Sequence, residues 1–175
     1  TFDDVPDSAC ETGAALLDAH GVKGTFYVSR TLLGTATEHW RVAGVEALAE
    51  IHRRGHEIGC HTHDHRLVPT LDAKRFAADL RRNRDALASL VPGLVLENFA
   101  FPYGYASLAA KGVLSRTYGS GRSIMPGLNA GRIDRYFLRA NPLFDRCLDA
   151  VPLARLMDEA VARNGWVIFF GHDVT

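Results

Sequence analysis

The sequence is poor in cysteine. Its three cysteines, Cys10, Cys60 and Cys147, are an odd number at unrelated spacings, which excludes a disulfide framework and a zinc ribbon. We expect them to be small buried thiols. Thiols without bridges slightly favour the reducing bacterial cytoplasm, while the bacterial cell envelope stays open as an alternative location.

The sequence also has no net charge and no long hydrophobic run. Its 20 basic side chains match its 20 acidic ones, so no overall field recruits nucleic acid or an anionic membrane surface. No apolar stretch reaches membrane-spanning length. We therefore expect neither a nucleic-acid partner nor a membrane-spanning segment, and the sequence leaves the oligomeric state open.

Repeats, linkers and nucleotide-binding glycine motifs are absent as well. The run Gly119-Ser120-Gly121 lacks the remaining glycines of a dinucleotide fingerprint. With 175 residues, of which 47% are hydrophobic, the chain is long enough for one domain with a sizeable core. We expect residues 1–175 to be a single domain that is cropped at both ends, because the chain opens on Thr1 and stops shortly after Asp173.

Strand-like and helix-like segments alternate along the chain. This alternation is typical of an α/β domain with parallel strands, and about seven strands suit a closed or nearly closed barrel with outer helices. An open doubly wound sheet is the alternative. Strands are predicted at 1–2, 23–29, 56–60, 97–101, 118–124, 136–140 and 166–170, and helices at 9–20, 42–54, 72–90, 107–116 and 152–164.

Two segments near the C-terminus are expected to be well buried. Residues 166–170 form a nearly continuous apolar run, as in a strand that is covered on both faces. The preceding helix, 152–164, has an apolar side that we expect to face the core. This side consists of Leu153, Leu156, Met157, Ala160 and Val161.

The most distinctive stretch is the histidine-rich segment 56–65. A short strand ends at Cys60, and three imidazoles and a carboxylate follow within five residues. If the chain forms a helical turn there, His61 and His65 lie four apart on one face. Two such imidazoles and one carboxylate from elsewhere make a three-ligand metal site with open positions for water. A solvated histidine-rich loop is the alternative.

Chemically capable residues recur just beyond the ends of the predicted strands. They are Asp3 and Asp4 after the first strand, His61 and His65 after the third, Pro102-Tyr103 after the next, and His172-Asp173 after the last. In a parallel barrel these ends share one face, where such folds keep their active sites. The third metal ligand is therefore expected to be Asp3 or Asp4.

Adjacent carboxylates on a strand end point in different directions, which favours different tasks for them. One is expected to bind the metal and the other to act as a general base toward a water. His172 is placed to protonate a leaving group, with a packed core histidine as the alternative. The turn at Tyr103 can aim a backbone N–H at a developing oxyanion.

Four motifs together resemble the polysaccharide deacetylase family, which is the NodB-homology domain of carbohydrate esterase family 4. The resemblance implies a distorted (β/α)7-type barrel of parallel strands with outer helices. It also implies a divalent metal, most commonly Zn²⁺ with Co²⁺, Ni²⁺ or Mn²⁺ as alternatives, and removal of N-acetyl groups from N-acetylhexosamine residues of a bacterial exopolysaccharide or cell-envelope glycan. The motifs are Thr1-Phe2-Asp3-Asp4, His61-Thr62-x-x-His65, Pro102-Tyr103-Gly104 and Phe170-Gly171-His172-Asp173.

The resemblance also implies a role for each matching residue. Asp3 looks like the catalytic base and His172 like the catalytic acid. Tyr103 would supply an oxyanion-hole amide. The implied metal ligands are Asp4, His61 and His65, and the implied substrate contacts are Pro102, Tyr103 and Phe170.

The chain departs from the family pattern at three places. Ala100 stands where the family usually has an arginine that pairs with the base, and we expect Arg139 to replace that arginine. The fourth-motif signature is not evident around 139–145, and Phe170 replaces a common leucine. A divergent subgroup is therefore expected, with a catalytically weak or inactive glycan-binding domain as the alternative.

Two other enzyme classes fit less well. His61 and His63 form a His-x-His pair like that of amidohydrolase-type barrels, but there the pair follows the first strand and needs further His and Lys ligands. Two histidines and a carboxylate also make an iron oxygenase site. Such a site has no clear use for the paired Asp3 and Asp4.

Overall fold

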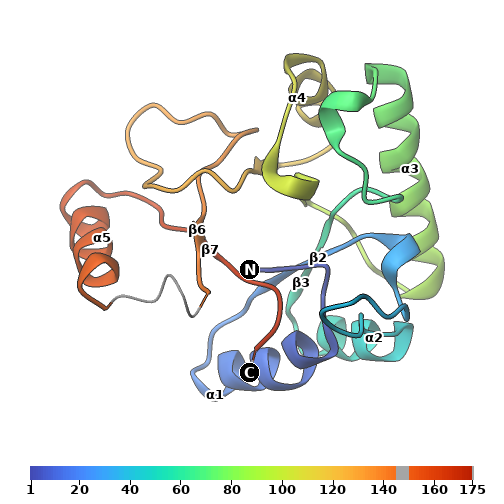
Figure 1. Ribbon diagram of the computed structural model, residues 1–175, viewed down its shortest axis with the longest axis horizontal. Helices are drawn as coiled ribbons and strands as arrows, with labels where there is room; N and C mark the ends of the chain where they lie inside the picture. The colour runs from blue at the N-terminus through green and yellow to red at the C-terminus, as the bar shows by residue number, and fades with distance from the viewer. Residues whose placement is uncertain (145–149, 175) are drawn as a thin grey trace.

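Five parallel strands form one curled sheet at the centre of the protein (Figure 1). In this computed structural model, which describes residues 1–144 and 150–174, the strands follow one another across the sheet in chain order. Cys10 and Cys60 are buried free thiols, as predicted, whereas Cys147 lies outside the described residues. The strands are β1 (Phe2–Asp3), β2 (Thr25–Val28), β3 (Glu57–Cys60), β4 (Asn98–Ala100) and β5 (Ser120–Arg122).

Single bridges extend this half-barrel on both sides. Leu138 bridges Arg122 at the end of β5, and Gly171 bridges Phe2 in β1, both in parallel orientation. The curled parallel sheet with helices outside it confirms the predicted distorted barrel. The two remaining strands pair with each other in parallel: β6 (Asn141–Pro142) and β7 (Phe169–Phe170).

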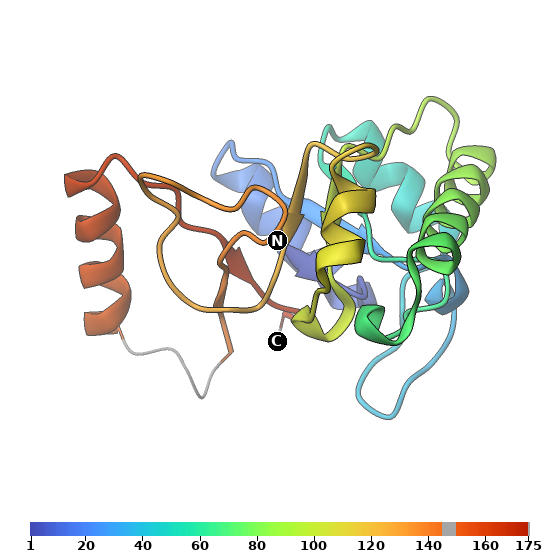
Figure 2. The same cartoon turned by 90° about the horizontal axis from the view of Figure 1, so that it is seen from above.

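Four helices pack around the sheet, and a fifth stands apart from them (Figures 1 and 2). The longest, α3, begins at Asp72, whose side chain accepts a hydrogen bond from the Arg75 N–H at 2.8 Å and so caps the helix. The helices are α1 (Ala14–Ala19, after a π-helical turn Ala9–Gly13), α2 (Val45–Arg53), α3 (Ala73–Leu90), α4 (Leu108–Leu114) and α5 (Ala150–Ala162). Short 3₁₀ turns lie at Arg30–Leu32, Val68–Thr70 and Pro102–Gly104.

The strands separate an apolar shell from a polar barrel interior. In β2, Phe26 and Val28 belong to the main hydrophobic core beneath the helices, whereas the alternate residues Thr25 and Tyr27 face the other way. The polar side chains inside the barrel pair with one another, as in the hydrogen bond from Thr25 Oγ1 to Glu57 Oε2 at 2.7 Å. The core residues supplied by the helices include Leu48, Ile51, Phe76, Leu80 and Leu87.

A glycine in β3 allows an aromatic ring to lie inside the barrel. A Cβ atom at Gly59 would come within 2.5 Å of the ring of Tyr27, its partner in the register between β2 and β3. Because Gly59 has none, the Tyr27 ring lies across the strand and contacts the guanidinium of Arg122, whose Cζ is 4.9 Å from the ring centre. The ring and the guanidinium therefore pack against each other inside the barrel.

The C-terminal segment differs from the sequence-based expectation. The last strand contains only Phe169 and Phe170, and Trp166, expected to be buried, is 52% exposed. On α5, Met157 and Val161 are 57% and 84% exposed, so the predicted inward face of this helix is wrong at these two positions, whereas Leu153, Leu156 and Ala160 are half-buried. Periodicity identified the helix but could not show that α5 stands away from the other helices (Figure 2). Among the described residues, no helix is both long and apolar enough to cross a membrane.

Candidate active site

The polar residues at the C-terminal ends of the strands line one cleft of about 740 Å³. The segments that follow β1, β3, β4 and β7 all contribute to it, as their positions in the sequence predicted. The cleft is lined by Asp3, Asp4, His39, Trp40, His61, His65, Tyr103, Ile124, Phe144, Phe170, His172 and Asp173.

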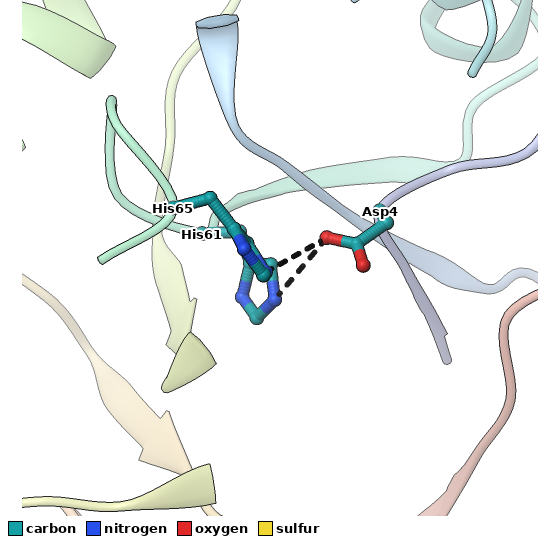
Figure 3. A group of neighbouring side chains, drawn as sticks. All are labelled: Asp4, His61 and His65. Atoms are coloured by element: carbon teal, nitrogen blue, oxygen red, sulfur yellow. Dashed lines mark ion pairs between the residues drawn. The ribbon is translucent and has the colours of Figure 1, made fainter. Parts of the chain in front are cut away.

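Within this cleft Asp4, His61 and His65 form a compact trio (Figure 3). The Nε2 atoms of His65 and His61 lie 3.1 and 3.7 Å from the same oxygen of Asp4, Oδ1. One ligand atom from each residue lies within 4.8 Å of the other two. Zinc ligands bound at about 2.0–2.2 Å are separated by similar distances in a tetrahedral site. This arrangement therefore fits a divalent cation.

The chemistry of the trio agrees with its geometry. Asp4 Oδ1 is buried and makes no well-directed hydrogen bond within the described residues, although both imidazoles approach it. Burial by itself would raise the pKa of Asp4, but the close approach of His65, together with the charges of His61 and His172, lowers it. An ionised, incompletely paired carboxylate oxygen between two imidazole nitrogens is the donor set that a bound cation would complete.

His61 is oriented by the neighbouring strand. Its Nδ1 lies 2.8 Å from the carbonyl oxygen of Ala100, which can only accept a hydrogen bond. Nδ1 therefore carries the proton and Nε2 presents its lone pair to the cleft. Metal-binding histidines are commonly oriented in this way, by an acceptor for the other ring nitrogen. Burial lowers the pKa of His61, which keeps the ring in this neutral form.

The segment that joins the two histidines is not the predicted helical turn. Residues 61–65 form bends in which Thr62 and His65 have left-handed backbone angles, with φ of 65° and 48°. These angles bring the imidazoles together by a route that sequence spacing could not indicate.

Left-handed backbone is concentrated around the cleft. Of the six non-glycine residues with positive φ in the described chain, five belong to the three segments that carry site residues. Val5 and Thr62, at φ 51° and 65°, are the most unusual because a β-branched side chain strongly disfavours this region. Such residues cost on the order of 1–3 kcal/mol each and are typical of functional sites. The five are Asp4, Val5, Thr62, His65 and Tyr103.

Helix α3 supports the histidine segment from below. Asp79 accepts a hydrogen bond from the backbone N–H of His63 at 2.6 Å. One turn later the buried Asn83 donates to the Val28 carbonyl at 2.9 Å and accepts from the Arg30 N–H at 3.0 Å. Burial raises the pKa of Asp79, yet its side chain fixes the backbone between the two candidate ligands.

Replacing Asp79 with leucine should therefore loosen the histidine segment. The part-buried His63 N–H would lose its acceptor, at a cost of about 1–3 kcal/mol in unfolding free energy. Zinc affinity should fall about tenfold, because the backbone between the two histidines would be held less firmly. Urea denaturation and competition with a zinc chelator measure the two effects. Asp85→Leu, at an exposed position of the same helix, is the matched control. Equal zinc affinities in the two variants would contradict this support.

Asp3 forms a buried ion pair with Arg122, and Arg139 does not take part. The Arg122 guanidinium donates to Asp3 Oδ1 and to the Ser123 carbonyl. The expectation for Arg139 is corrected: it is exposed and donates to the Pro126 carbonyl at 2.8 Å. Burial alone would raise the pKa of Asp3, but the Arg122 charge, with a smaller effect of His61, lowers it.

The position of Arg122 compensates for the missing motif arginine. Arg122 and Ala100 are Cα partners in the register of β5 and β4, so the guanidinium enters the barrel from the adjacent strand. Its Cζ lies 4.9 and 5.2 Å from the ring centres of Tyr27 and Phe170. A charged residue inside the buried strand predicted at 118–124 was the sequence signal for this role. It was missed because strand order and register are not apparent in the sequence.

The remaining predicted residues surround the trio. His172 Nε2 lies 3.9 Å from Asp4 Oδ2. The Tyr103 ring packs edge-on against His65 with 4.9 Å between ring centres, and Phe170 lines the cleft while contacting Arg122. Pro102 was expected to contact substrate, but it is buried and does not line the cleft.

Comparison with known proteins places this geometry in a family. A profile of the polysaccharide deacetylase family matches residues 1–117. A probable peptidoglycan-N-acetylglucosamine deacetylase from Arthroderma benhamiae is 28% identical over 103 residues, which is 59% of this chain. The chain spans only 22% of the length of that relative.

Solved structures share the fold. The Streptococcus pyogenes deacetylase PplD, determined with acetate, superposes with a TM-score of 0.78 over 89% of this chain and 68% of its own, at 16% identity. A mutant of a CE4 family pseudoenzyme superposes with a TM-score of 0.62 over 99% of this chain and 55% of its own, at 14% identity. The fold therefore occurs in both deacetylases and pseudoenzymes. On the family match over residues 1–117, the chain belongs to the polysaccharide deacetylase family.

Proposed function

We propose that the chain is a metal-dependent hydrolase that removes N-acetyl groups from N-acetylhexosamine residues of a polysaccharide. The observation that carries this proposal is the pairing of two adjacent carboxylates with different partners. Asp4 faces His61 and His65, whereas Asp3 faces Arg122. A site for binding alone needs only the first group, while hydrolysis needs both a cation site and a separate base.

Asp4, His61 and His65 would hold the cation. Two neutral imidazoles and one carboxylate are typical of catalytic zinc, so Zn²⁺ is proposed, with Co²⁺, Ni²⁺ or Mn²⁺ as substitutes. When bound, the metal would polarise the acetyl carbonyl and lower the pKa of the attacking water.

The other residues would move protons and orient the amide. Asp3, kept ionised by Arg122, would accept a proton as the water oxygen bonds to the acetyl carbon. The Tyr103 N–H would donate to the developing oxyanion. His172 would protonate the sugar nitrogen as the C–N bond breaks, releasing acetate and a free amine.

The substrate would be a bacterial exopolysaccharide or cell-envelope glycan. The cleft supports a sugar ligand because aromatic side chains border it on several sides, and aromatic faces pack well on the apolar faces of pyranose rings. Tyr103, Phe144 and Phe170 supply these rings.

Metal removal tests the proposed function. Acetate release from N-acetylglucosamine oligomers should disappear when the protein is chelated and return when Zn²⁺ is added, because the cation activates the water. His65→Ala should lose zinc binding and activity together. His63→Ala is the matched control, because its imidazole pairs with Asp64 at 2.7 Å instead of facing Asp4.

The alternative function predicts a different result. If zinc binds tightly but no amino-sugar glycan yields acetate, the chain is a glycan-binding domain that has kept the fold without turnover. The similar pseudoenzyme structure is the observation that favours this second candidate.

A further inference from the structure

The loop between β2 and α2 brings a tryptophan to the cleft, although this loop belongs to none of the four motifs. Trp40 and His39 both line the cleft. Thr37 organises the tip of the loop: its hydroxyl donates to the Trp40 carbonyl at 2.9 Å and accepts from the Trp40 N–H at 3.0 Å. The Thr37 N–H also donates to the same carbonyl at 2.9 Å. The position of the Trp40 backbone is therefore determined by local hydrogen bonds.

The base of this loop is tied to the segment that carries Asp4. The Asp7 N–H donates to the Arg41 carbonyl at 2.9 Å, and the Ala43 N–H donates to the Val5 carbonyl at 3.0 Å. Trp40 and the candidate metal ligand Asp4 are thus held on one connected backbone unit.

The Trp40 ring stacks on the imidazole of His172. The ring centres are 5.1 Å apart and the planes differ by 23°. Phe144 is also nearly parallel to His172, at 5.9 Å and 24°. Between these contacts His172 directs Nε2 toward Asp4, 3.9 Å from Oδ2. Aromatic contacts thus define the plane of the imidazole.

The indole itself is incompletely satisfied. Trp40 Nε1 is buried and has no hydrogen-bond acceptor among the described residues, whereas a buried indole N–H normally has one. Hydrogen bonding of the indole N–H therefore does not explain where the ring lies. The contact that the ring does make is the stacking on His172.

We propose that Trp40 is a positioning residue for His172, which holds the imidazole at the angle needed to protonate the leaving nitrogen. This inference rests on the deacetylase function proposed above, because it assigns Trp40 a part in that reaction. The loop that carries Trp40, which lies outside the four motifs, then also affects the rate of the reaction.

Three variants test the proposal by steady-state kinetics. Trp40→Ala should lower kcat about 10- to 100-fold, since a misoriented general acid loses most of its contribution. KM and zinc affinity should stay within about twofold, because the substrate contacts and ligands are unchanged. Trp40→Phe should recover most of kcat by restoring a stacked ring. Trp166→Ala, which removes the other tryptophan at a position outside the cleft, is the matched control.

A structural readout separates this inference from the proposed function. In the NMR spectrum, the imidazole C–H signals of His172, assigned with His172→Ala, should be shifted upfield by the Trp40 ring current and move downfield in Trp40→Ala. Unchanged signals, an unchanged kcat, or a raised KM with normal kcat would each overturn the positioning role. If the unaltered protein releases no acetate, the deacetylase proposal fails, and the NMR shift alone decides whether Trp40 orients His172.

Discussion

Asp3→Asn should lower the rate of acetate release by about three orders of magnitude while zinc still binds, as expected when a general base is lost. Asparagine has nearly the same shape as aspartate but cannot accept the proton of the attacking water at neutral pH. The metal trio does not include Asp3, so its donor set stays complete. Acetate release and a zinc competition titration on the same sample separate the two effects.

The matched comparison for Asp3→Asn is Asp4→Asn. The neighbouring carboxylate belongs to the trio, so its neutral analogue should weaken zinc binding as well as turnover. The two variants carry the same chemical change one residue apart. Full activity in Asp3→Asn would remove Asp3 from the reaction, and loss of zinc in both variants would mean that Asp3 is also a ligand.

Arg122→Met should be the most destabilising single change in the site. It leaves the carboxylate of Asp3 buried without its guanidinium partner, and breaking a buried ion pair in this way costs about 3–5 kcal/mol of unfolding free energy. Turnover should fall as well, because the orientation of Asp3 depends on the same contact. Urea denaturation of the zinc-bound protein, with acetate release at a temperature where it stays folded, measures both.

A second arginine can test whether position or charge matters. Ala100→Arg in the Arg122→Met background restores a guanidinium from β4, the register partner of β5. It should recover part of the lost stability and activity. Arg139→Met is the matched control, since the side chain of the exposed Arg139 donates to the Pro126 carbonyl and forms no ion pair with Asp3. Equal losses in Arg139→Met and Arg122→Met would contradict the assignment of Arg122.

The sequence predicted what depends on local pattern. Alternating strands and helices indicated the barrel. Asp4 and His61 directly follow β1 and β3, His65 was identified by its spacing from His61, and the choice of Asp4 over Asp3 as the ligand came from the family resemblance. The helical turn at 61–65 was wrong because nothing in the residue types indicates left-handed angles at Thr62 and His65.

Contacts between distant segments could not be predicted. Arg122 reaches Asp3 across 119 residues of sequence, and that contact depends on strand order and curvature. The same is true of Trp40 and His172, which lie in segments that come together only in the folded barrel. The predicted burial of the apolar side of α5 was wrong in part for another reason. Its amphipathic pattern indicates an apolar face but does not show which element packs against that face.

The left-handed residues around the cleft constrain how this fold could be engineered for heat tolerance. Glycine is the residue that relieves a positive φ most readily, so a selection for stability alone would favour it at positions such as Thr62, whose buried hydroxyl has no hydrogen-bond partner among the described residues. Those substitutions would also free the turns that hold the ligands in place, and resistance to heat would be gained at the expense of turnover. Asn164, the sixth such residue, lies outside the cleft. It is the position where the two properties can be improved independently.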